Sequence, residues 1–394
     1  MWLVNQIYPK LVQVKFFGSG HDLSIRLDSL AFVGSKHKLT KVISVESNVI
    51  WLECLESESE LRLKDEVKFY TVEDITHLQP SYFGQAINLL GKVISPQSRE
   101  VVEANSWDFI PVVQNGERIV ANQKIGYCQI HDHLKFWLLS NQSGQVRGIA
   151  AGKCNFDSNL TQINSIDQFF HTSIDYSNLS LSRHLQKPFV TSISTLDLLY
   201  PILIGSCNRI HNPPKRVFQS FLQSASIDIT IVINTKFQGN LPFNTIQLVD
   251  TFNQANIMIQ SAYSLAKQLM TMGYKVLIWN NLPFISCVSC VKWNCGLGET
   301  MESEEFGLTV VDTVNNYQTY DNTLSFADEK LQFDSSFLED DIENYLSSIG
   351  NIQYLTDFKT FHSKVTKSQD LQELLNLKTD LTLESLHQLV NSKN

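Results

Sequence analysis

The apolar residues of this chain change their spacing partway along the sequence, and this change constrains the fold more than any other feature. In roughly the first 75 residues they form short runs with a period near two, separated by polar or glycine-containing turns. These runs are Leu11–Phe17, Ser24–Leu27, Val42–Val45, Val49–Leu55 and Val67–Val72. From about residue 190 the spacing becomes helical and alternates with short β-branched runs. A chain with both patterns predicts a multi-domain protein, with a β-domain first and an α/β-domain later.

The period-two region predicts a small N-terminal β-barrel over residues 1–78, because closing the sheet removes its exposed edges. Residues 79–106 contain two prolines and two glycines and are expected to be a connector. A second β-rich module is predicted over 107–185. Its apolar runs are separated by Asn115-Gly116 and Ser143-Gly144. Asn-Gly between apolar runs predicts a β-hairpin at that point.

The α/β pattern occupies residues 186–334. Lys215–Ser224 has the apolar spacing of one helical face, and Ile227–Ile233 is typical of a buried strand. A longer amphipathic helix follows, with Gly273 placed to end it, and Tyr274–Trp279 is the next predicted strand. Alternation of helix and strand predicts a mainly parallel sheet. Residues 335–394 are expected to form a short helical region, beginning with a capping-box pattern at Ser336 and Glu339.

Composition excludes several functions. The chain has 394 residues, a net charge of −9 and 18% charged residues. Without a Lys/Arg cluster, this acidic balance argues against nucleic acid and anionic membranes as main partners. No apolar run approaches the ~18 residues of a membrane span, and no signal peptide is expected, so a cytoplasmic location is predicted. Cys287, Cys290 and Cys295 lack a fourth nearby Cys or His, so no metal site is predicted.

Several segments, in this order, resemble the catalytic A subunit of V- and A-type rotary ATPases. Ser81-Tyr-Phe-Gly84 through Pro96 is similar to the connector that these subunits place after their barrel. The segment from Trp107 to Val146 is similar to their inserted module. The segments that are similar to their nucleotide-binding core are Lys187–Ile202, Thr251–Asn253, Ala262–Ala266 and Met272–Val276.

The resemblance implies a RecA-like P-loop core, ATP or ADP with Mg²⁺ as cofactors, and B-like and stalk subunits as partners. It also implies a position at the membrane periphery within the ATPase complex. A P-loop binds phosphate through backbone N–H groups, a lysine and a hydroxyl group. Here the corresponding loop region is Gly205–Val217, in which Lys215 matches the lysine. Pro214 replaces the preceding glycine and has no N–H, and Arg216 replaces the Mg²⁺-binding hydroxyl residue.

Two other catalytic positions of this family are also altered. Matching on Gly239-Asn240 puts Phe237 at the position of the catalytic glutamate, and a phenyl ring cannot polarise water. The Walker B aspartate is replaced by Asn280 or Asn281, of which Asn281 is taken as the match. An amide is a neutral and weaker Mg²⁺ ligand than a carboxylate.

The sequence therefore predicts a non-catalytic, A-subunit-like component of a V/A-type ATPase head. Lys215 and Arg216 are its only predicted nucleotide-binding residues. One alternative is an ATP-hydrolysing or ATP-synthesising subunit with a rebuilt phosphate site around these two residues. A helix N-terminus beside two cations can attract phosphate. Another alternative is a stand-alone adaptor that has kept only the fold.

Overall fold

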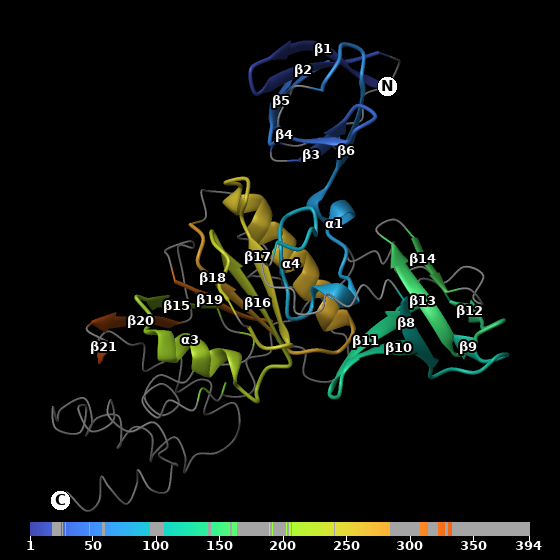
Figure 1. Ribbon diagram of the computed structural model, residues 1–394, viewed down its shortest axis with the longest axis vertical. Helices are drawn as coiled ribbons and strands as arrows, with labels where there is room; N and C mark the ends of the chain where they lie inside the picture. The colour runs from blue at the N-terminus through green and yellow to red at the C-terminus, as the bar shows by residue number, and fades with distance from the viewer. Residues whose placement is uncertain are drawn as a thin grey trace, which may run out of the picture.

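The architecture comes from a computed structural model, which has a β-barrel, an antiparallel sheet and an α/β core whose sheet is packed by helices (Figure 1). The residues that the structure describes are 1–17, 25, 27, 29–46, 48–56, 60–94, 106–140, 143–157, 160–163, 189, 191, 202, 205, 207–239, 241–283, 308–313, 322–327 and 330–332. The predicted helical region 335–394 and Cys287, Cys290 and Cys295 lie outside these residues. In the described part of the chain, no helix is long and apolar enough to cross a membrane.

The N-terminal barrel is confirmed as a closed sheet with the strand order β1-β2-β5-β4-β3-β6. Its strands are β1 (Trp2–Tyr8), β2 (Leu11–Phe16), β3 (Leu30–Val33), β4 (Lys38–Glu46), β5 (Val49–Cys54) and β6 (Glu66–Tyr70). Pairing of Trp2 with Val67 closes it. Alternate residues such as Val12 and Val14 fill the interior, as a period of two requires. The third strand is Leu30–Val33. Of the strand predicted at Ser24–Leu27, the described residues Ile25 and Leu27 are not in a strand, and Ser24 and Arg26 lie outside the described residues.

A five-stranded antiparallel sheet follows, with the order β11-β10-β8-β13-β14. Its strands are β8 (Ser106–Pro111), β10 (Lys124–His131), β11 (Leu134–Leu139), β13 (Gly152–Asp157) and β14 (Leu160–Ile163). The short strands β9 (Arg118–Ile119) and β12 (Gly144–Gln145) pair beside it. Figure 1 shows this sheet on the right of the core.

The hairpin predicted at Asn115-Gly116 is wrong. The strands on either side of that turn, β8 and β9, lie in different sheets, and the hairpin is β10–β11. Asn115 instead uses its side chain to hold a distant segment: its Nδ2 donates to Ile149 O at 3.1 Å and its Oδ1 accepts from Ile149 N at 2.8 Å. The turn itself forms, because Glu117 N donates to Gln114 O at 3.1 Å and Gly116 has a φ of +89°, but the strands that it joins pair with other strands.

The core is confirmed as a mainly parallel sheet of eight strands, with the order β21-β20-β15-β19-β18-β16-β17-β7. Its strands are β7 (Ala86–Ile87), β15 (Cys207–His211), β16 (Ile229–Asn234), β17 (Thr245–Val249), β18 (Val276–Asn280), β19 (Leu308–Asp312), β20 (Asn322–Ala327) and β21 (Lys330–Gln332). Only β20–β21 pairs antiparallel among these neighbours. The edge strand β7 comes from the segment predicted to be a connector.

Two helices pack on opposite faces of this sheet. Helix α4 (Ala255–Thr271) shares a hydrophobic cluster with Ile278 of β18, whereas α3 (Lys215–Leu222) contacts the adjacent Trp279. Successive strand residues point to opposite faces, so the two helices cover different sides. Helix α4 ends as predicted at Gly273, whose φ is +92°, and Tyr274 N donates to Leu269 O in a Schellman-type cap.

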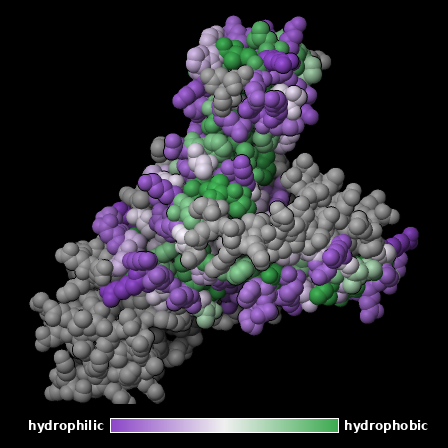
Figure 2. All heavy atoms as spheres, viewed as in Figure 1, coloured by the Kyte–Doolittle hydropathy of each residue, from purple (hydrophilic) through white to green (hydrophobic). Residues whose placement is uncertain are grey.

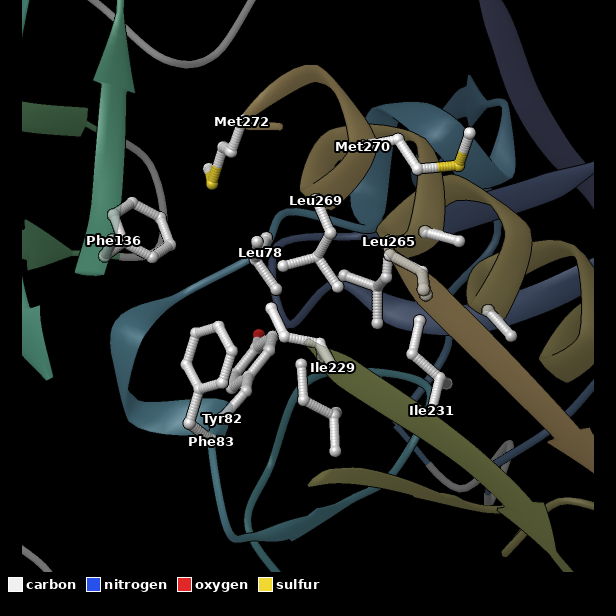
Figure 3. Packing of buried hydrophobic residues seen from close by; sticks show 14 of the residues in the cluster. Leu78, Tyr82, Phe83, Phe136, Ile229, Ile231, Leu265, Leu269, Met270 and Met272 are labelled. Carbon is white, nitrogen blue, oxygen red and sulfur yellow. The ribbon is translucent and has the colours of Figure 1, made fainter. Parts of the chain in front are cut away.

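The segment that leaves the barrel is bound to α4. It contains α1 (Val72–Ile75) and the 3-10 turn Pro80–Tyr82. The side chain of Gln268 accepts from Leu78 N at 2.9 Å and donates to Thr76 O at 2.7 Å. Figure 3 shows Leu78 and Tyr82 packed between α4, β16 and β11. On the face shown in Figure 2, hydrophobic residues gather below the barrel.

Tyr82 gives this packing a predicted pH dependence. Burial raises the pKa of Tyr82 to about 12, from an ordinary value of 10.0. The folded state therefore keeps the phenol proton after the unfolded chain has lost it, and this contribution to stability disappears as pH rises from about 10 through about 12. We expect Tyr82→Phe to lose less stability than the wild type over this interval, measured by urea unfolding at each pH. Tyr8→Phe, at an exposed position, is the control. Identical pH slopes for Tyr82→Phe and the wild type would contradict the prediction.

Candidate functional site

The candidate site is the edge of the core sheet at which the parallel strands end. In open α/β sheets this carboxyl edge is where ligands bind. Strands β16, β18 and β19 are adjacent, and their register aligns Ile233 with Asn280 and Asn280 with Asp312. The residues that follow, Asn281 and Thr313, also lie at this edge. The edge is therefore polar although the strands behind it are buried.

Asn280 bridges β18 and β19. Its Nδ2 donates to Asp312 Oδ1 at 2.8 Å and to Leu282 O at 3.2 Å, and its Oδ1 accepts from Leu282 N at 2.9 Å. Asn280 is 2% exposed and Asp312 is fully buried. The carboxylate of Asp312 is thus paired with an amide donor from the neighbouring strand.

Asn281 connects three strands on the face that carries α3. Its Nδ2 donates to Asn234 Oδ1 at the end of β16. Its Oδ1 accepts from Thr313 Oγ1 at 2.8 Å and from Trp279 Nε1 at 3.1 Å. Both polar atoms of the side chain are therefore bound to the protein itself.

The connection between β15 and α3 lies in the segment that the resemblance matches to a P-loop, and it is short. Residues Cys207–His211 form β15, which pairs with β19 on one side and β20 on the other. Only three residues, Asn212, Pro213 and Pro214, separate this strand from α3. The helix predicted from Lys215 is confirmed, and strand pairing on both sides of β15 takes up residues that a phosphate-binding loop would need.

Lys215 and Arg216 are the first two residues of α3, and both are exposed. Pro214 precedes them at the N-cap, where its carbonyl accepts from Val217 N at 2.9 Å. The two prolines before Lys215 have no N–H to donate. The helix start thus carries positive charge but lacks the run of backbone donors that cradles a phosphate.

Phe237 lies in the loop between β16 and β17 and is half-buried. The buried side chain of Gln247 on β17 binds the backbone of the residues immediately before and after Phe237. Its Nε2 donates to Lys236 O and its Oε1 accepts from Gln238 N, each at 3.2 Å. The loop is fixed by protein contacts, and its central side chain is apolar. Asn240, used in the sequence match, lies outside the described residues.

The residues at this edge do not fit bound Mg²⁺ and ATP. The side-chain amides of Asn280 and Asn281 are both engaged in hydrogen bonds to neighbouring protein groups. Asp312 accepts one of these bonds, and the helix start lacks backbone donors at two successive positions. We therefore assign no catalytic step to this edge.

Three residues of this network were missed from the sequence: Asn234, Asp312 and Thr313. Each stands at the end of an apolar run, Ile229–Ile233 or Leu308–Val311, which is the pattern of a polar residue at the carboxyl end of a buried strand. That pattern could have indicated their place at the edge. It could not have indicated which strand ends are neighbours.

The fold, a β-barrel followed by a mainly parallel core, is similar to the fold of solved ATPase structures. Two of the structures that this chain resembles are of the ATPase EscN from the type III secretion system of enteropathogenic E. coli. The assembled EscN matches with a TM-score of 0.51, and EscN in complex with its central stalk EscO with 0.52. In both comparisons the identity is 12%, with 99% of this chain and 100% of the other covered. At this identity the similarity concerns the fold. No family model and no curated protein matches the sequence.

Proposed function

We propose that this chain is a non-catalytic, A-subunit-like component of the head of a V/A-type rotary ATPase or ATP synthase, a proton- or sodium-translocating complex. In this proposal Lys215 and Arg216 are remnants of the phosphate site, Phe237 stands in place of the catalytic glutamate, and Asn281 in place of the Walker B aspartate. The proposed domains are 1–78, 79–106, 107–185, 186–334 and 335–394.

The observation that carries this proposal is the three-residue connection between β15 and α3. A phosphate-binding loop needs glycine-rich backbone that turns its N–H groups toward the phosphates. Here two of the three connecting residues are prolines. A cation at Lys215 alone could attract a phosphate group, but it could not orient one for transfer.

Assembly with other subunits is the second part of the proposal. The EscN structures are of an assembled ATPase, in one case with its central stalk. By analogy we propose that this chain occupies a position in a ring, in contact with B-like subunits and stalk subunits, peripheral to the membrane. Fold similarity supports such a role only as analogy.

Nucleotide binding tests the non-catalytic part. By titration calorimetry with ATP or ADP, with and without Mg²⁺, we expect no heat of binding, and the same result for Lys215→Ala. The reason is that two prolines precede Lys215, so the described start of α3 lacks the backbone donors of a phosphate cradle. At the described edge, Asp250 and Asp312 both accept hydrogen bonds from the protein itself. A micromolar Kd, about −8 kcal/mol, that requires Mg²⁺ and is lost in Lys215→Ala would favour the ATP-hydrolysing alternative.

Purification of the tagged chain from its own cells tests the second part. Recovery with B-like and stalk subunits would support a place in the ATPase head. Recovery of the chain without any of these subunits would favour the stand-alone adaptor.

A further inference from the structure

Amide side chains at the end of β18 bind Asp312 and Thr313 at the end of β19, and we infer that this network has replaced a bound cation as the element that joins these strand ends. The inference rests on the proposed function, because it requires an edge that no longer carries out metal-dependent chemistry. It goes beyond that function because it assigns to Asn280 and Asp312 the role of joining the ends of β18 and β19.

Asn280 is the centre of the inference because only an amide can make its contacts. Its nitrogen donates to a carboxylate on β19 and to Leu282 O, while its oxygen accepts from Leu282 N. A carboxylate has acceptors only and could not replace the nitrogen. An aspartate in this position would place a second carboxylate at hydrogen-bond distance from Asp312, with both groups buried. Two buried carboxylates in contact cannot both ionise without a cation between them.

The ladder between the same strands continues past their ends. Asn281 N donates to Ile233 O at 3.0 Å, and Thr313 N donates to Asn280 O at 2.9 Å. Thr313 Oγ1 also lies 3.3 Å from Asn280 O. The strand ends are therefore held by backbone and side-chain bonds together, and Asn280 is a positioning residue within them.

The test compares melting temperatures of the full-length chain in excess Mg²⁺ and in EDTA. We expect the wild type to melt at the same temperature in both. We expect Asn280→Asp to melt lower by about 5 °C or more, the size associated with leaving buried polar groups unpaired. Asn48→Asp makes the same chemical change at an exposed position and should have no comparable effect.

A double variant separates the proposed partnership from a simple loss of packing. In Asn280→Asp with Asp312→Asn, donor and acceptor are exchanged between the two strands, so we expect at least half of the lost melting temperature to return. If Asn280→Asp does not accumulate as folded protein, recovery of folded protein in the double variant decides the question.

Three results would overturn the inference: an unchanged melting temperature in Asn280→Asp, no recovery in the double variant, or a wild type stabilised by Mg²⁺. Failure of the proposed function is detected separately, because nucleotide binding is measured on the wild type by calorimetry. A chain that binds ATP but still shows loss and recovery in these variants would contradict the function and keep the network.

Discussion

Gly126→Ala is expected to destabilise the five-stranded sheet by about 3 kcal/mol, at the upper end of the usual cost of overpacking. A Cβ atom at Gly126 would lie 2.2 Å from Phe109 Cε2 and 2.7 Å from Ile110 O on the neighbouring strand. Phe109 is 1% exposed and belongs to the main hydrophobic cluster, so its ring has little room to move. Part of the clash involves backbone, which a side-chain rotation cannot relieve. Urea unfolding followed by tryptophan fluorescence measures the effect.

Gly144→Ala is the matched control for this substitution. Gly144 is also in a strand, and a Cβ atom there would meet nothing within 4 Å. We expect its midpoint in urea to remain close to that of the wild type. Equal midpoints for the two variants would show that the ring of Phe109 does not need the space at Gly126.

Trp279→Ala is expected to cost about 3–5 kcal/mol, the usual range for removing a large buried aromatic side chain. Trp279 is 2% exposed, and its ring centroid lies 5.1 Å from that of Phe218 and 5.2 Å from that of Phe221 on α3. Its Nε1 also donates to Asn281. The substitution would therefore leave a cavity under α3 and remove one bond from the network at the strand ends.

Trp279→Phe separates these two losses. Phenylalanine keeps an aromatic ring against α3 but has no N–H, so we expect a much smaller loss of stability than with alanine. Thermal unfolding and hydrogen exchange of the α3 amides measure both variants. Equal stability of the alanine and phenylalanine variants would contradict the idea that ring packing under α3 stabilises the fold more than the hydrogen bond to Asn281 does.

The sequence predicted the barrel and the parallel core because their apolar periods are strong and local. Strands β5, β16 and β18 and helix α4 coincide closely with predicted segments. Strand β15 was not predicted, because Cys207-Asn-Arg-Ile-His has no clear period and owes its conformation to two strands from much later in the chain. Strand β7 was also not predicted, because it has only two residues and pairs with β17, which lies much later in the chain.

The sequence identified individual residues of the candidate site but not the contacts between them. Motif order located Lys215, Phe237 and Asn281, and whether these positions are equivalent to those of the rotary ATPases stays a prediction. The contact between Asn280 and Asp312 spans 32 residues, and no local pattern indicates it. The sequence alone shows that Pro214, Phe237 and Asn281 differ from the residues that the resemblance expects at these positions. It does not show the hydrogen bonds that the side chains of Asn280 and Asn281 make.

The origin of β7 also sets an order of events during synthesis of the chain. Ala86 and Ile87 leave the ribosome about 160 residues before their partners, Gln247 and Leu248. At roughly 5–20 residues per second, the finished barrel would wait on the order of ten seconds or more for the strand that its connecting segment must join. Until then the hydrophobic residues around Tyr82 and Phe83 lack the strands of the core sheet and helix α4, with which they share a hydrophobic cluster. We expect a chaperone to bind these hydrophobic residues mainly between the completion of the barrel and the synthesis of β17.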